Sequence, residues 1–568
     1  MNSSSVRRSP AALATRFVLA AVLAFAALQV VASVLRAQAP GSQEAGLAPL
    51  FGETVEVRVI NVEVVVTDKQ GLEVTGLQAG DFALKVDGEE VPIQYFTEVR
   101  GGDAIEGPAD EPVIPDVPQL APGSPVGTSY LVFIDDFYPL PRDRNKVIEK
   151  ISADLGRLRP EDRMAVVAYD GLRLEMLSSW SQSSAELERV FRKAMARPAK
   201  GLQREGEDNR YTRTDRARRL ANERGSFDSS QMRLDLEERA YAETLQEQVE
   251  GIVAAASSAL RGFANPPGRK VLVLLAGGWP YDPAEYAVND YNRTIIEPLL
   301  KRGDTIFAPL IGTANQLGYT IYSVDVPGLT EKTNSSAEYK SGSNFNERNT
   351  LFQRENNVQF SLQHLATETG GKALLNSQRE EVLARVTEDT RSYYWIGFSP
   401  TWQGDDTAHK LTMSTRVSDL RIRNRAGFVD FSPRSQTSMA VESILLFGEG
   451  PESAPLPVEL GTPRKISGNK MNVPVTLRIP LGMLTVLETE KGFSAEVELR
   501  IAARDERGGR SDIPVIPIRL DMPGKPPANA YATYSTTIQL RRARNELVLA
   551  VSDATSGAIY SAKAEVQP

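Results

Sequence analysis

Residues 130–136 read Tyr-Leu-Val-Phe-Ile-Asp-Asp, five apolar residues followed by two aspartates. A run of this kind, with no polar residue to face water, is typical of a strand that is buried on both faces. Four comparable runs follow, separated by helical patterns, at residues 164–169, 271–275, 320–326 and 393–398. Short apolar strands that alternate with helices predict an α/β fold, with a doubly wound, mostly parallel sheet over residues 128–432.

The rest of the chain divides by composition and by the period of its apolar residues. Residues 54–100 show alternating valines and a tight-turn signal, which predict a small N-terminal β unit. Residues 101–127, rich in Pro, Gly and acidic residues, predict a linker. Residues 200–240 are dense in charge and predict a solvated helical insertion within the α/β domain. In residues 433–568 the helical period disappears, which predicts a C-terminal β-sandwich.

The overall composition narrows the chemistry open to the chain. The 568 residues include 65 Lys and Arg against 73 Asp and Glu, so the net charge of −8 does not favour nucleic-acid binding. The chain has no cysteine, which excludes disulfides, thiolate nucleophiles and Cys-ligated metals. It has only two histidines, so multi-histidine metal sites are disfavoured.

Residues 1–39 have the pattern of an export signal. Three arginines precede an almost wholly apolar stretch at residues 17–35, and residues 37–39 resemble a small-residue cleavage site. The stretch at 17–35 is also long enough to span a bilayer, so an uncleaved anchor is the alternative. We therefore expect an extracytoplasmic protein, periplasmic or secreted, that touches the membrane only through this segment if it is not cleaved.

Three stretches carry a resemblance to a known family. They are Val-Glu-Val-Val-Val-Thr-Asp-Lys at 62–69, Leu-Val-Phe-Ile-Asp-Asp at 131–136, and Tyr-Tyr-Trp-Ile-Gly-Phe-Ser-Pro at 393–400. With the order of predicted elements, these stretches resemble a von Willebrand factor A-like domain, and more narrowly the VWFA-related family of acidobacterial type. The likeness spans residues 55–430 and implies the A-like α/β fold between two β-rich units.

The resemblance also implies a divalent cation at the end of the first central strand. Such a site uses Asp-x-Ser-x-Ser, a Thr and a second Asp. Asp135 occupies the first ligand position, but Phe137 and Pro139 stand where the serines are implied, and Gly277 replaces the second Asp. We therefore expect a degenerate metal-ion-dependent adhesion site, with Asp135 as the only matched ligand and no cofactor. The simplest expectation for Asp135 and Asp136 is that they are polar residues at a strand end that cap the following loop. A bound divalent cation such as Mg²⁺, or an altered site at which the two aspartates bind a cation or a basic partner, is the less favoured alternative.

A binding crevice is expected at the carboxyl ends of parallel strands whether or not a metal is present. The sequence places six acidic and aromatic residues near this edge: Asp135, Asp136, Tyr138, Asp170, Trp279 and Tyr281. A rim of this composition suits the recognition of another protein. Of the histidines, we expect His364 to be packed or at the surface, and His409, just after two aspartates, to lie on an exposed strand edge.

These observations favour an exported, non-enzymatic protein–protein interaction module of adhesion type. Its expected partners are other proteins at the cell envelope, with no nucleic acid and no small-molecule cofactor. One alternative is an exported hydrolase that uses carboxylates such as Asp135, Asp136 and Asp325. The other is a purely structural envelope scaffold without a binding partner at the strand ends.

Overall fold

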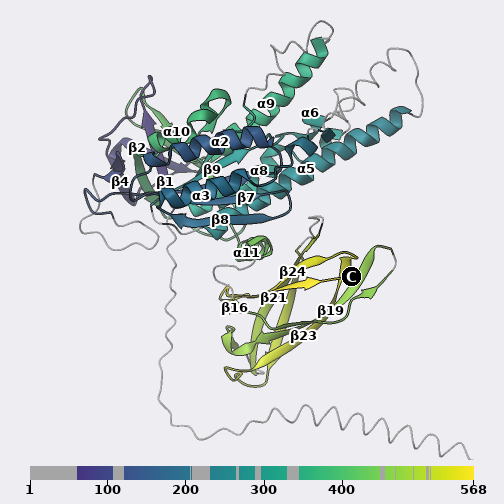
Figure 1. Ribbon diagram of the computed structural model, residues 1–568. Helices are drawn as coiled ribbons and strands as arrows, with labels where there is room; N and C mark the ends of the chain where they lie inside the picture. Colours follow the sequence, from purple (N-terminus) through teal and green to yellow (C-terminus); the bar gives the residue numbers. More distant parts are fainter. Residues whose placement is uncertain are drawn as a thin grey trace, which may run out of the picture. The chain divides into compact units, whose positions relative to one another are not determined.

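The computed structural model describes most of the chain beyond the predicted signal (Figure 1). The described residues are 60–105, 120–204, 206–207, 230–263, 266, 268–287, 296–328, 345–447, 454–466, 468–489, 492–506, 511 and 513–568. Residues 1–39, much of the 101–127 linker and the centre of the 200–240 insertion lie outside them. Among the described residues, no helix combines the length and the apolarity needed to cross a membrane.

The stretch at 130–136 forms the middle of a six-stranded sheet of order β11-β10-β9-β6-β7-β8. Five of its strands run parallel, and β8 joins the edge in the antiparallel direction. The strands are β6 (Thr128–Asp135), β7 (Arg163–Tyr169), β8 (Leu174–Ser181), β9 (Arg269–Ala276), β10 (Tyr319–Asp325) and β11 (Ala373–Leu374). The four predicted strands between residues 130 and 326 are therefore confirmed.

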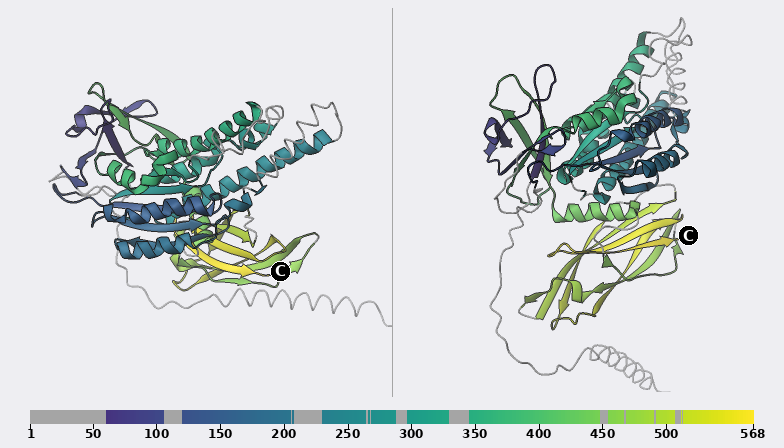
Figure 2. Two further views of the ribbon diagram at one scale, coloured as in Figure 1. Left: turned by 45° about the horizontal axis from the view of Figure 1, so that its top comes forward. Right: turned by 60° about the vertical axis from the view of Figure 1, so that its left-hand side comes forward.

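Helices cover both faces of this sheet, so each face has its own apolar core. Alternate residues of β6 point to opposite faces: Leu131 and Phe133 into one core, Val132 and Ile134 into the other. The first core receives α5 (Ser230–Gly262), α8 (Gly303–Leu317) and α9 (Phe345–Glu368). The second receives α2 (Pro141–Ala153), α3 (Ser184–Met195) and α10 (Val382–Asp389). Figure 1 shows the long helices α5 and α9 extending beyond the sheet, and Figure 2 shows the same fold from two other directions.

Strands that precede the predicted α/β region and strands from its C-terminal end build two antiparallel sheets that share a core. One sheet has the order β14-β1-β12-β4-β5 and the other β15-β13-β2-β3. The strands are β1 (Ile60–Thr67), β2 (Phe82–Val86), β3 (Glu89–Val91), β4 (Tyr95–Arg100), β5 (Asp103–Ala104), β12 (Tyr393–Phe398), β13 (Thr407–Thr415), β14 (Arg421–Arg423) and β15 (Gly427–Asp430). The unit predicted at 54–100 is thus completed by strands that follow residue 392.

The prediction that residues 393–398 form a strand of the central parallel sheet is wrong. β12 instead pairs antiparallel with β1 and β4. Its run is apolar because both faces of this antiparallel strand are covered: Tyr394 and Ile396 enter one core, while Tyr393 and Trp395 enter another. A strand buried on both faces therefore has the same local pattern in either kind of sheet.

The C-terminal part contains two more sheets around one apolar core. One consists of β16 (Ala454–Pro455), β20 (Leu487–Thr489), β21 (Gly492–Asp505), β22 (Val515–Met522), β24 (Asn545–Asp553) and β25 (Ile559–Val566). The other consists of β17 (Val458–Leu460), β18 (Arg464–Lys465), β19 (Lys470–Pro480) and β23 (Tyr531–Arg541). A helix precedes them, α11 (Pro433–Phe447), although the sequence analysis expected no helix after residue 433.

These sheets overturn the predicted fold class. The doubly wound, mostly parallel α/β sheet of von Willebrand factor A type was expected to dominate, but the sheet that contains β6 is only one of the five sheets in the described residues. The other four are built almost entirely from antiparallel pairs, with the short β16–β25 pair as a parallel exception. The chain is therefore a β-rich mixed structure. Local periodicity identified strands, but it did not show which distant strand each one joins.

Candidate functional site

Asp135 ends β6, and its carboxylate is fully buried. Its Oδ1 accepts hydrogen bonds from the backbone N–H groups of Phe137 (2.8 Å) and Tyr138 (3.2 Å). Its Oδ2 accepts hydrogen bonds from the backbone N–H of Gly277 (3.2 Å) and from the indole Nε1–H of Trp279 (2.8 Å). Burial raises the pKa of Asp135 to about 6, and the four donors oppose that rise. The carboxylate therefore joins the chain after β6 to the chain after β9.

The chain itself fills the space beside Asp135. A Cβ atom at Gly277 would lie 2.3 Å from the Cδ and N atoms of Pro139, and 2.7 Å from the Cβ of Tyr138. Glycine is therefore required at this close approach. Gly277 and Pro139 both depart from the ligand pattern that the resemblance implies, and here they pack against each other. Pro139 and Gly277 thus occupy complementary positions beside the Asp135 carboxylate, which favours a structural role for Asp135.

Asp136 lies in a different environment, on the face of the sheet that α2 and α3 cover. It is fully buried and forms ion pairs with Arg144 (Nη1 to Oδ1, 2.5 Å) and Arg197 (Nε to Oδ2, 2.7 Å). Arg197 also pairs with Glu175 on β8. Burial raises the pKa of Asp136, and the two guanidinium groups oppose the rise. Asp135 and Asp136 therefore do not form one binding site.

Tyr138 and Asp170 also have local structural partners. The ring of Tyr138 lies beneath the guanidinium of Arg204, 4.8 Å from ring centroid to Cζ. Burial raises the pKa of the Tyr138 hydroxyl. Asp170, just after β7, accepts hydrogen bonds from the backbone N–H groups of Leu172 and Arg173, both at 2.8 Å. This pattern stabilises the turn between β7 and β8.

Trp279 and Tyr281 come together around one core ring. Trp279 is fully buried and stacks on Phe307 of α8, with ring centroids 6.3 Å apart. Tyr281 stacks on the same ring at 6.2 Å and is only half-buried. Its edge meets two side chains of α9, Phe360 at 4.6 Å and His364 at 5.4 Å. Of the six predicted crevice residues, Tyr281 is thus the one that joins an aromatic cluster at the surface.

Phe360 was not among the predicted site residues, and its ring is the most exposed of this cluster. Phe360 is 49% exposed and stacks on His364, one helical turn later, with an interplanar angle of 6°. Burial lowers the pKa of His364, which favours the neutral form of its ring. The spacing of two aromatic rings at positions i and i+4 of a helix was the available signal.

Charged residues at the start of α8 border the cluster. A Cβ atom at Gly303 would lie 2.2 Å from the ring of Tyr281, so the α8 backbone packs directly on that ring. On either side of this glycine, Arg302 and Asp304 are exposed. The Nε atom of Arg302 lies 3.6 Å from Oδ2 of the buried carboxylate of Asp282. We define the Tyr281 surface as Tyr281, Phe360, His364, Arg302 and Asp304.

Asp325, the third carboxylate of the hydrolase alternative, lies at the end of β10. Strand β9 separates β10 from β6, which carries Asp135. Asp325 is nearly fully buried and accepts hydrogen bonds from the backbone N–H groups of Gly328 (3.2 Å) and Asn376 (3.4 Å). Asp135 and Asp325 are therefore held by different donors, and this geometry gives no support to a paired-carboxylate site.

Comparison with known proteins adds little to this geometry. No protein-family model matches the chain, and no curated protein matches it. Among solved structures, the pilus adhesin SpaC from Lactobacillus rhamnosus GG is 7% identical, with a TM-score of 0.25, over 77% of this chain and 56% of the adhesin. The TFIIH p34 N-terminal domain is 10% identical, with a TM-score of 0.18, over 46% of this chain and 97% of that domain.

A third similar structure is Bacteroides uniformis β-glucuronidase 2. It is 10% identical, with a TM-score of 0.14, over 32% of this chain and 19% of the enzyme. The chain thus spans about half the length of the pilus adhesin and a fifth of the glucuronidase. TM-scores this low establish no shared fold with any of these proteins.

Proposed function

We propose that the chain is an exported, non-enzymatic binding protein that contacts another protein of the cell envelope through the Tyr281 surface. The observation that carries the proposal is the exposure of Phe360 within a cluster of three rings. Single exposed apolar residues are common on proteins, but clustered aromatic rings beside an exposed arginine have the composition of a protein-binding hot spot. The export signal predicted at residues 1–39 supports the envelope as the location.

The Tyr281 surface is also held rigidly, which favours binding. The Tyr281 ring packs against the ring of Phe307 and against the Gly303 backbone. Its backbone N–H donates a hydrogen bond to Oδ1 of Asn357 at 2.7 Å. A side chain that is already fixed loses little conformational entropy when a partner binds. The sequestered carboxylates of Asp135 and Asp136 favour this binding role over hydrolysis.

Site-specific photo-crosslinking tests the proposal. A photoreactive phenylalanine analogue would replace Phe360 in one version of the chain and Tyr531 in another. Tyr531 is a matched control, because it is an aromatic residue of β23 that is 54% exposed. We expect a defined crosslinked envelope protein from position 360 and none from position 531.

The captured protein is then purified, and its dissociation constant is measured with wild type, Phe360→Ala and Tyr531→Ala. Loss of a hot-spot side chain costs about 2 kcal/mol or more, which corresponds to roughly 30-fold weaker binding. We expect that loss for Phe360→Ala and unchanged binding for Tyr531→Ala. Equal crosslinking at both positions would contradict the proposal, because capture would then not depend on the Tyr281 surface. No crosslink at either position would also contradict it and would favour the scaffold alternative.

A further inference from the structure

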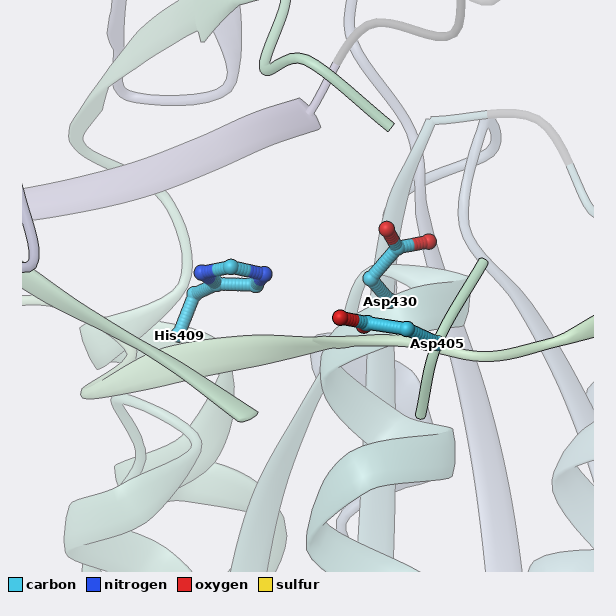
Figure 3. Close-up of side chains that lie close together, drawn as sticks. All are labelled: Asp405, His409 and Asp430. Carbon is cyan, nitrogen blue, oxygen red and sulfur yellow. The ribbon is translucent and has the colours of Figure 1, made fainter. Parts of the chain in front are cut away.

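Three potential metal ligands lie together on the four-stranded sheet β15-β13-β2-β3. They are Asp405, just before β13, His409 within β13, and Asp430 at the end of β15 (Figure 3). One ligand atom from each lies within 4.8 Å of the other two. The strand register explains this proximity, since Thr407 is directly opposite Asp430 and its neighbours two residues away project from the same face.

A fourth residue orients the imidazole. Nδ1 of His409 lies 2.7 Å from Oδ2 of Asp87, in the turn between β2 and β3. Oδ1 of Asp87 accepts a hydrogen bond from the backbone N–H of Lys410 at 2.8 Å, which fixes the carboxylate. The ring of His409 also stacks on Phe428, with centroids 4.9 Å apart. With Nδ1 engaged, Nε2 is the nitrogen left to bind a ligand, and Figure 3 shows the ring directed along its plane toward the two carboxylates.

The two carboxylates differ in how firmly they are held. Asp430 is 3% exposed, and its Oδ2 accepts hydrogen bonds from the backbone N–H groups of Gln403 (2.5 Å) and Gly404 (2.8 Å). No hydrogen bond to its Oδ1 is found among the described residues. Asp405 is exposed, and its Oδ1 accepts a hydrogen bond from the backbone N–H of Thr407 at 3.0 Å. The site therefore combines one fixed carboxylate with one that can adjust.

We infer that His409, Asp405 and Asp430 form a site for a divalent transition-metal ion of the Zn²⁺ class, independent of the Tyr281 surface. An imidazole with two carboxylates suits Zn²⁺ better than Mg²⁺ or Ca²⁺, which prefer oxygen ligands alone. A carboxylate on the far nitrogen of a metal-binding histidine is the usual second partner of such a ligand. Three protein ligands leave one tetrahedral position open to water or to a side chain from another protein.

The separations fit this ion after a small movement. Ligand atoms about 2.1 Å from Zn²⁺ lie roughly 3.4 Å apart in a tetrahedron. Closing separations of up to 4.8 Å to that distance requires movements of up to about 1.4 Å, and the exposed side chain of Asp405 is the ligand with the most freedom to move.

Calorimetric titration of the full chain with ZnCl₂, after treatment with EDTA and dialysis, tests the inference. We expect one Zn²⁺ per chain with a micromolar or tighter dissociation constant. His409→Gln should weaken binding by roughly 100-fold or more because it removes the nitrogen ligand, and Asp87→Asn by about 10- to 100-fold because it removes the orienting carboxylate. His364→Gln is the matched control, since it removes the other of the two histidines, and it should leave binding unchanged.

A second measurement keeps the test independent of folding defects in the variants. In wild-type protein labelled with ¹⁵N-histidine, only two imidazole groups give signals. Zn²⁺ should shift the nitrogen resonances of one imidazole, the one absent from the spectrum of His409→Gln. The inference is overturned if Zn²⁺ shifts neither imidazole, if it shifts His364 alone, or if His409→Gln binds Zn²⁺ with the wild-type dissociation constant.

Discussion

Replacing Arg144 with methionine should destabilise the parallel-sheet region strongly. The Arg144 side chain is fully buried, and its Nη1 donates to Oδ1 of Asp136 at 2.5 Å. Its Nη2 donates to the backbone carbonyls of Met195 (3.1 Å) and Arg197 (2.9 Å). Methionine preserves much of the side-chain length, so the variant removes the charge and the donors with little loss of volume.

The magnitude follows from what the variant leaves behind. Asp136 keeps only the Arg197 ion pair, and two partly buried backbone carbonyls each lose a donor. Removing one partner of a buried ion pair costs about 3–5 kcal/mol, because the remaining charge is uncompensated. The pKa of Asp136 in the folded variant should rise further, so that its protonated form is favoured at low pH. A carboxyl group with a raised folded pKa destabilises the fold as pH rises, so the deficit relative to wild type should be smaller at pH 4 than at pH 7.

Hydrogen-exchange mass spectrometry of peptides from β6 and α2 gives the local opening free energy. A loss of 3–5 kcal/mol lowers the protection factor by roughly two to three and a half powers of ten. The control is Arg385→Met. Arg385 lies in α10 and forms an exposed ion pair with Glu381, which directly precedes that helix. Its loss should lower the free energy of unfolding by no more than about 0.5 kcal/mol. In the double variant Arg144→Met/Asp136→Asn, the total cost should fall below the sum of the single costs by roughly 2–3 kcal/mol. A loss of less than about 1 kcal/mol in the local opening free energy of Arg144→Met would contradict this prediction. So would a double variant whose loss equals the sum of the losses of the two single variants.

Three further outcomes are expected from buried groups of the same sheet. Burial raises the pKa of Asp135 to about 6, against 3.8 in an unperturbed chain. Wild type should therefore lose about 2 kcal/mol of stability between pH 4 and pH 7 relative to Asp135→Asn, as measured by urea unfolding at each pH. Trp279→Phe removes a hydrogen bond to that carboxylate; urea unfolding at pH 7 should show a loss of roughly 2–4 kcal/mol, and the midpoint of the pH dependence should move upward. Gly371→Ala places a Cβ atom 1.9 Å from the carbonyl oxygen of Ile321 and should cost about 2–3 kcal/mol in thermal unfolding. The control is Gly80→Ala, whose Cβ has no atom within 4 Å, and it should change stability by less than about 1 kcal/mol. Equal effects would show that backbone crowding at Gly371 does not matter.

The candidate site was predictable in part. Trp279 and Tyr281 follow the end of a buried strand by only a few residues. This position in the sequence predicted the approximate location of the Tyr281 surface. The same reasoning placed Asp135 and Asp136 in one crevice, but consecutive residues of a strand point to opposite faces, and each carboxylate has its own buried donors. Phe360 was missed because a side chain on a distant helix meets Tyr281 only in the folded chain.

The sequence by itself determined where the buried strands of the parallel sheet lie, because continuous apolar runs require cover on both faces. It also determined that Asp135 lacks the other ligands of the family pattern. Only the tertiary structure decided that β12 joins β1 rather than the parallel sheet, and that Asp87 orients a histidine 322 residues away. Local periodicity reports how deeply a segment is buried, whereas strand pairing and side-chain clusters depend on contacts between segments that are far apart in the chain. The cluster around His409 depends on such distant contacts. For that reason the sequence alone predicted only that His409 lies on an exposed strand edge.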